Sequence, residues 1–139
     1  MNASAGSREQ ARCKLAAQVL LSSGRLRLRA TGTSMLPTLC PGDVLTIQQQ
    51  LFSRVLPGDL ILYTRHDRFF VHRVIRKFIE NGRPMLLTCG DALSQPDTPV
   101  SAQEFLGIVV GAKRDRPMTA RAGFHSRLHS LLRYWYDKH

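Results

Sequence analysis

The sequence predicts a small, mainly antiparallel β domain of the α+β class, with an amphipathic helix at each end. Three observations predict this fold class. Residues 25–29 alternate strictly between arginine and leucine, which is typical of a half-buried strand. Two short apolar runs each follow a Pro-Gly-Asp turn, and such turns often precede strands. A run rich in β-branched and aromatic residues is followed by Asn-Gly, which indicates a β-hairpin.

The first expected element is an N-terminal amphipathic helix over residues 8–22. Gly24 follows it and is a good helix stop. The small and apolar residues of this segment recur at helical spacing: Ala11, Leu15, Val19 and Ser22, with Ala16 and Leu20 beside them.

The arginine–leucine run predicts the first strand, with Leu26 and Leu28 directed inward and the arginines outward. An outward row of charge has two interpretations. It can bind an acidic partner, or it can discourage aggregation of an exposed edge strand. We favour the second.

The remaining elements follow in order. The segments after the two Pro-Gly-Asp turns predict strands at residues 43–47 and 59–63. A long hairpin is expected from residues 68–79, the Asn-Gly turn and residues 85–88, and a final strand at 104–112. A C-terminal helix is expected over residues 119–136, with these residues on one stripe: Phe124, Leu128, Leu131, Leu132 and Trp135.

Length and composition indicate one folded domain with tails. The chain has 139 residues, 43% of them hydrophobic and 22% charged, close to the globular norm. We divide it into an N-terminal extension, a β domain and a basic C-terminal tail, at residues 1–24, 25–112 and 113–139.

The cysteines and the apolar runs bear on compartment and cofactors. Cys13, Cys40 and Cys89 form no CxxC pair, so we expect neither a disulfide framework nor a metal site, and no cofactor. The apolar run at residues 15–21 is too short to span a bilayer. We therefore expect a cytoplasmic protein without a transmembrane segment.

The net charge of +10 is concentrated towards the C-terminus, where residues 113–139 carry seven lysines and arginines. Such a surplus attracts phosphate-bearing partners. The C-terminal helix fits peripheral contact with an anionic membrane at its inner face. A helix packed on the β domain with a solvated basic face predicts the same pattern, and we favour that reading.

The candidate nucleophile is Ser34, in the stretch ATGTSMLPTLCPGD at residues 30–43. Here a strand is expected to end and a turn to begin, which can expose a hydroxyl beside unpaired backbone N–H groups. A serine in a turn more often hydrogen-bonds locally. Catalysis also requires a base within reach, because a serine hydroxyl is a weak nucleophile by itself.

His72 is the candidate base. In the expected strand it shares a face with Phe70, Val74 and Phe78, where desolvation favours a neutral, proton-accepting imidazole. Lys77 is expected on the opposite face and is therefore a poor alternative base. A histidine bonded to a backbone carbonyl at the edge of the core is the competing interpretation.

Two carboxylates follow the hairpin in TCGDALSQPD, namely Asp91 and Asp97. Either one can orient His72 through its other ring nitrogen and stabilise an imidazolium. Both can equally be ordinary turn aspartates.

Five segments in order carry a resemblance: GTSMLPTLCPGDVL, PGDLILY, VHRVI, LTCGDALSQPD and FLGIVVGA. This succession resembles the type I signal peptidase and LexA-like serine peptidases of the S24/S26 group, and it spans residues 29–112. The resemblance implies the β domain of the signal peptidase and LexA C-terminal type. The pair His72-Arg73 resembles the histidine-type branch, in which histidine replaces the usual lysine.

The resemblance implies a serine endopeptidase that resembles signal peptidase I and acts on a peptide or protein substrate. Ser34 is then the nucleophile, His72 the base, and Asp91 and Asp97 the acidic residues of the site. The backbone N–H groups of Ser34 and Thr33 are expected to bind the oxyanion, and the substrate-binding residues are expected to be Met35 and Pro37.

This chain is expected to depart from the family pattern at three points. We expect no membrane anchor, Gly32 stands where many members place an oxyanion-binding serine, and Cys89 stands where histidine-type members often have lysine. A binding or regulatory module that keeps the fold without the reaction is therefore an alternative. About 25 residues precede the expected domain, too few for a three-helix DNA-binding module, so nucleic acid is not an expected partner.

Overall fold

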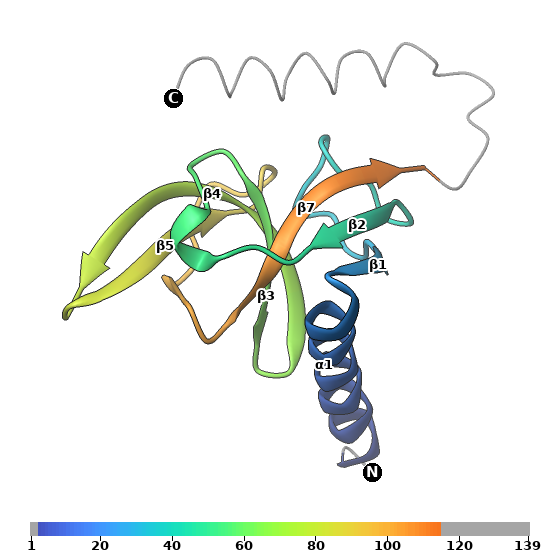
Figure 1. Ribbon diagram of the computed structural model, residues 1–139. Helices are drawn as coiled ribbons and strands as arrows, with labels where there is room; N and C mark the ends of the chain where they lie inside the picture. Colours follow the sequence, from blue (N-terminus) through green and yellow to red (C-terminus); the bar gives the residue numbers. More distant parts are fainter. Residues whose placement is uncertain (1–2, 115–139) are drawn as a thin grey trace.

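The computed structural model describes residues 3–114 (Figure 1). It confirms a mainly antiparallel β domain preceded by one helix. The expected C-terminal helix at residues 119–136 lies outside the described residues.

Helix α1 spans Ala3–Ser23 and ends before Gly24, whose φ of 75° is readily adopted only by glycine. The helix was predicted, but its buried stripe is offset from the expected one. Ala16 and Leu20 are buried, whereas Leu15 is 61% exposed. α1 runs beside the turn between β3 and β4 (Figure 1), where Cys13 contacts Asp67 and Arg12 contacts Phe69. The sheet therefore covers the helix face that contains Ala16 and Leu20, not the face that contains Leu15.

Seven strands form one antiparallel sheet in the described part of the chain, in the order β1-β2-β7-β3-β4-β5-β6. Their bounds are β1 Arg25–Arg29, β2 Val44–Gln48, β3 Leu60–Arg65, β4 Arg68–Glu80, β5 Arg83–Cys89, β6 Val100–Ser101 and β7 Phe105–Lys113. The 3-10 helix η1 at Phe52–Arg54 and the short strand β6 were not predicted. As expected, β1 is an edge strand with exposed arginines.

Two hairpin turns shape the long strand β4. Asn81 and Gly82, with φ of 52° and 74°, connect β4 to β5 as the Asn-Gly signal predicts. His66 and Asp67, with φ of 53° and 58°, connect β3 to β4. This second hairpin was not predicted, because its turn contains no glycine.

A β-bulge in β4 corrects the expected strand faces. Val74 pairs with Thr88 and Arg76 pairs with Leu87, so Ile75 is an extra residue. Lys77 pairs with Leu86 and therefore shares the face of His72, which contradicts the alternation read from the sequence. Phe78 moves to the other face. Lys77 is nevertheless engaged elsewhere, since its Nζ donates to the Ser53 carbonyl at 2.8 Å.

The buried residues form two clusters on the coiled sheet. The first lies between α1, β1, β2 and β3 and includes Leu20, Met35, Leu39, Leu45, Ile47, Leu60 and Leu62. The second lies beneath η1 and includes Val55, Ile61, Tyr63, Val74, Leu86 and Val100. Among the described helices, none is both long and apolar enough to cross a membrane.

Candidate active site

Ser34 lies in a closed loop between β1 and β2. The loop is closed at its base because the Ala30 N–H donates to the Asp43 carbonyl at 2.7 Å and the Gly42 N–H to the Ala30 carbonyl at 2.8 Å. Met35 and Leu39 are buried and anchor the loop in the first core cluster. The half-buried serine therefore stands on a fixed backbone beside the sheet.

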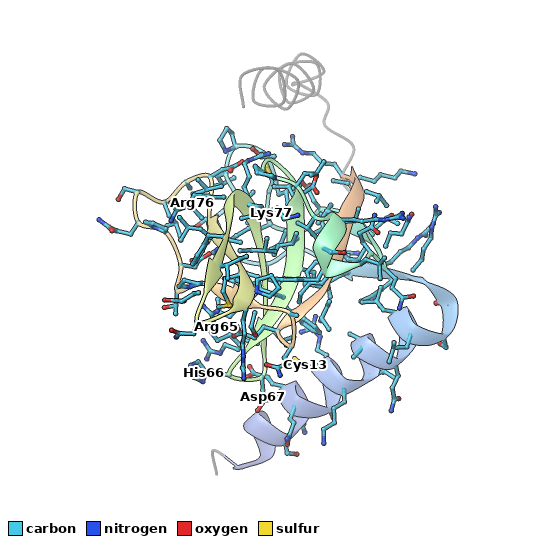
Figure 2. The ribbon with its side chains drawn as sticks, turned by 60° about the vertical axis from the view of Figure 1, so that its left-hand side comes forward. Cys13, Arg65, His66, Asp67, Arg76 and Lys77 are labelled. Carbon is cyan, nitrogen blue, oxygen red and sulfur yellow. The ribbon has the colours of Figure 1, made fainter. Side chains whose placement is uncertain are left out.

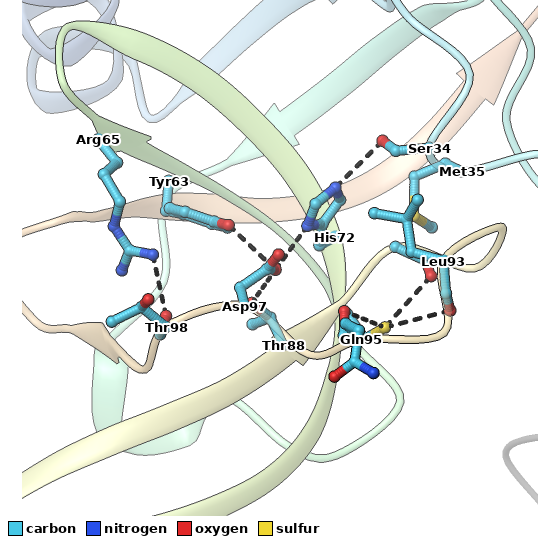
Figure 3. A network of polar contacts seen from close by, with 12 residues as sticks. Ser34, Met35, Tyr63, Arg65, His72, Thr88, Leu93, Gln95, Asp97 and Thr98 are labelled. Carbon is cyan, nitrogen blue, oxygen red and sulfur yellow. Dashed lines mark hydrogen bonds and ion pairs between the residues drawn. The ribbon is translucent and has the colours of Figure 1, made fainter.

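His72 comes from the middle of β4 and is 5% exposed. Its ring makes edge contacts with the rings of Tyr63 and Phe70, at centroid distances of 6.2 and 6.1 Å. Its Nε2 lies 3.1 Å from Ser34 Oγ (Figure 3). The expected meeting of this hydroxyl and this imidazole is therefore present in the structure.

Asp97 lies on the other side of the imidazole, where its Oδ2 is 2.6 Å from His72 Nδ1. The same oxygen accepts hydrogen bonds from Thr88 Oγ1 at 2.6 Å and from Tyr63 OH at 3.1 Å. Because an ionised carboxylate can only accept, Nδ1 is the donor to Asp97, and in the neutral form of the ring Nε2 can then accept from Ser34.

The protonation equilibria around Asp97 favour a carboxylate. Burial opposes its ionisation, but the hydrogen bonds from His72, Thr88 and Tyr63 prevail and hold the pKa of Asp97 below its ordinary value. Burial, and then the charge of Asp97, raise the pKa of Tyr63, so the phenol remains a donor.

Asp91 has different partners, although it lies only six residues from Asp97. Arg73 donates to both of its oxygens, with Nε–Oδ1 and Nη2–Oδ2 distances of 2.8 Å. Thr38 donates to Oδ2 at 2.5 Å. Asp91 therefore joins β4 to the loop of Ser34 and does not contact His72.

The backbone around Gly90 holds the serine loop in place. The Ala92 N–H donates to the Ser34 carbonyl at 2.9 Å, and the Asp91 N–H points to Met35 Sδ at 3.3 Å. A Cβ atom on Gly90 would lie 2.6 Å from the Ser34 carbonyl oxygen and 3.2 Å from His72 Nε2. Only glycine allows this segment to approach both residues so closely.

The backbone N–H groups of Thr33 and Ser34 are the expected oxyanion donors. Within residues 3–114, neither group donates a hydrogen bond to a protein acceptor. Gly32 precedes them with a φ of 77°, a conformation that exposes consecutive N–H groups in turns. Both groups are thus available to a ligand.

Two clefts flank the serine loop, and the expected substrate-binding residues divide between them. Ser34 and His72 line the first cleft, of about 200 Å³, together with apolar residues of β1 and β4 such as Leu28, Phe69 and Val71. Met35 lies at the wall of this cleft but is only 5% exposed. Pro37 lies in the second cleft, of about 280 Å³, with Arg73, Ile75 and Leu93.

Three residues of this site were not predicted from the sequence, namely Tyr63, Thr88 and Gly90, and Arg73 was noted only as the neighbour of His72, without its pairing to Asp91. Gly90 directly precedes a candidate aspartate in the sequence, but the close backbone approach that requires a glycine there is visible only in the structure. Tyr63 and Thr88 sit in apolar strands and read as core residues. Within residues 3–114, no group of three or more metal-ligating side chains is present.

Comparison with known proteins adds one finding. A family model described as Peptidase S24-like matches residues 3–110. The matched segment contains Ser34, His72, Asp91 and Asp97. A search of the curated proteins finds no match.

Proposed function

The chain belongs to the Peptidase S24-like family, and we propose that it is a serine endopeptidase that resembles signal peptidase I. One observation carries this proposal. Ser34 Oγ, His72 Nε2, His72 Nδ1 and Asp97 Oδ2 form a continuous line, with distances of 3.1 Å and 2.6 Å. This is the relation of nucleophile, base and orienting carboxylate that activates a serine.

In the first step, Ser34 Oγ forms a bond to the carbonyl carbon of the scissile peptide while its proton moves to His72 Nε2. The carbonyl π electrons move to oxygen and produce an oxyanion. Asp97 stays ionised and stabilises the imidazolium, in agreement with its lowered pKa. The N–H groups of Ser34 and Thr33 supply the donors for the oxyanion.

In the second step, the carbon–nitrogen bond breaks and His72 gives its proton to the departing amine. An ester between Ser34 and the acyl half of the substrate remains. Water then attacks this ester with His72 again as base, which releases the carboxylic acid and restores the serine. No cofactor enters this scheme.

The strand pairing supports a peptide as the substrate. β4 pairs with β5 only from Arg73 onward, and β1 pairs with β2 alone in the described sheet. Residues of these two strand edges line the same cleft as Ser34 and His72. An extended peptide that enters the cleft can add to these edges through main-chain hydrogen bonds.

The cleft also limits the side chain beside the scissile bond. Its volume of about 200 Å³ and its lining by Leu28, Ala30, Phe69 and Val71 suit a small apolar side chain. We therefore assign cleavage next to small residues to this site.

The direct test is labelling with a fluorophosphonate probe, read by mass spectrometry. We expect the probe to modify Ser34 of the wild-type protein and to leave Ser34→Ala unlabelled. Ser53→Ala is the matched control, because Ser53 is exposed and lies outside the site, and it should label like the wild type.

A peptide library scanned for cleavage completes this test. Cleavage by the wild type that is lost in Ser34→Ala supports the peptidase. Absence of both labelling and cleavage in the folded wild type would instead support a binding module that keeps the fold.

A further inference from the structure

Arg65, at the end of β3, lies outside the line of reacting groups but touches the residues that hold Asp97. We propose that Arg65, paired with Glu104, is a positioning residue that fixes the Asp97 carboxylate against His72. The inference rests on the proposed function, because it assigns a role in the same reaction.

The first route from Arg65 to Asp97 runs through the backbone (Figure 3). Arg65 Nη1 donates to the Thr98 carbonyl at 2.9 Å, the bond drawn in Figure 3. Arg65 Nη2 donates to the Pro99 carbonyl at 3.0 Å. These are the two residues that follow Asp97. On the other side, the Asp97 N–H donates to the Thr88 carbonyl at 2.8 Å. The chain at Asp97 is therefore held from both directions.

The second route runs through Tyr63. The Arg65 guanidinium carbon lies over the Tyr63 ring at 5.3 Å from its centroid, within the range of a cation–π contact. The hydroxyl of that ring donates to Asp97 Oδ2 at 3.1 Å. One side chain thus constrains both the backbone after Asp97 and a hydrogen-bond donor to its carboxylate.

Glu104 fixes the direction of the guanidinium. It accepts from Arg65 Nε at 2.8 Å and from Nη2 at 3.1 Å. The Ser101 N–H donates to it at 3.1 Å, and the Thr64 N–H donates to its carbonyl at 2.9 Å. The Arg65 and Glu104 side chains are 19% and 28% exposed, so solvent competes little for these bonds.

The geometry requires an arginine in particular. The guanidinium directs donors to three acceptor groups in one plane, namely Glu104 and the carbonyls of Thr98 and Pro99. A lysine keeps the charge, but its single ammonium cannot replace this planar fork. Arg65→Lys therefore separates positioning from charge.

The chain offers a matched control in Arg76. Its guanidinium carbon also lies over an aromatic ring, that of Phe78, at 5.1 Å from the centroid. It is exposed and lies on the β4–β5 hairpin, away from Arg65 (Figure 2). Arg76→Lys changes the same chemical group without touching the Asp97 loop.

The experiment compares Arg65→Lys and Arg76→Lys in the full chain. The readouts are kcat and KM for a cleaved peptide, the rate of fluorophosphonate labelling, and the ring ¹⁵N NMR shifts of His72, which report its tautomer. We expect Arg65→Lys to lower kcat and the labelling rate by about tenfold to a hundredfold, with KM within about twofold. The fraction of His72 with its proton on Nδ1 should fall, and Arg76→Lys should match the wild type.

An unchanged His72 tautomer in the folded Arg65→Lys variant would overturn the proposal, whatever its kcat. If Arg65→Lys does not fold, Glu104→Gln provides the same readouts, because it loosens the guanidinium while keeping the arginine. The NMR measurement does not require turnover, so it tests the positioning role of Arg65 separately from the proposed peptidase activity. A wild type that neither labels nor cleaves refutes the peptidase, whereas an unaltered tautomer in the folded variant refutes the positioning role.

Discussion

The two ends of the loop at residues 90–97 carry the same side chain and use it differently. At one end, Asp91 is bound by Arg73 and Thr38 and joins β4 to the serine loop. At the other end, Asp97 is bound by His72, Thr88 and Tyr63. The first carboxylate holds the loop of Ser34, the proposed nucleophile, and the second is bonded to His72, the proposed base.

The reason for this difference lies in β4. His72 and Arg73 are adjacent in the strand, so their side chains leave it on opposite faces. β5 ends at Cys89, opposite Arg73, and the loop that follows passes the edge of β4 beside His72. Asp91 of this loop binds Arg73 on one face of the strand, and Asp97 binds Thr88 and His72 on the other face. Adjacent residues of a strand can thus recruit two carboxylates from one loop for separate tasks.

The largest expected effect comes from Asp97→Asn. The amide cannot hold His72 with its proton on Nδ1 as a carboxylate does, so we expect kcat to fall by about 10³–10⁴-fold. Steady-state kinetics with a cleaved peptide measures this change. Asp67→Asn, in an exposed turn, is the control and should retain wild-type kcat. A loss of less than tenfold in Asp97→Asn would contradict the assigned role.

Removal of the Asp91 carboxylate is expected to lower the stability of the fold more than the rate of the reaction. The Arg73 and Asp91 side chains are 6% and 16% exposed, and Asp91→Ala leaves a buried guanidinium without its carboxylate partner. We expect the free energy of unfolding to fall by about 3–5 kcal/mol, measured by urea denaturation. The Ala92 bond to the Ser34 carbonyl remains, so kcat of the folded fraction should fall less than in Asp97→Asn. If kcat falls more in folded Asp91→Ala than in Asp97→Asn, the roles proposed for Asp91 and Asp97 are wrong.

The smallest expected effect is a pH dependence of stability to which the Asp97 end of the loop contributes. The pKa of Asp97 is lowered in the folded state, so its stabilising contribution is complete above the unfolded value of about 3.9. That contribution is lost as the pH falls through the folded value. The wild-type free energy of unfolding should therefore decline below about pH 4, and the decline should be shallower in Asp97→Asn.

Glu104→Gln tests the same acid range at the carboxylate that binds Arg65. Its hydrogen bond with Arg65 is the largest cause of the lowered pKa of Glu104. This variant should flatten the acid decline as well. If the free energy of unfolding declines equally below about pH 4 in the wild type and in both variants, neither carboxylate contributes stability through its lowered pKa.

Much of the fold and part of the site could be predicted from local pattern. Alternation identified β1, the Asn-Gly turn identified the β4–β5 hairpin, and turn chemistry placed Ser34 in its loop. These features depend on residues close together in the chain. The turn at His66 and Asp67 was missed because their positive φ values carry no glycine signal. The buried face of α1 was missed by one position, since the sheet decides which stripe it covers.

The sequence by itself determined the strands, the serine loop, and the presence of a histidine and two aspartates in a workable order. Only the tertiary structure decided which aspartate meets the histidine, that Tyr63 and Thr88 bind the same carboxylate oxygen, and that Arg65 fixes the loop after it. The physical reason is register. The extra residue Ile75 in β4 reverses the sheet face on which the following side chains of the strand lie. Contacts between distant segments depend on such shifts in strand register, which neighbouring residues in the sequence do not reveal.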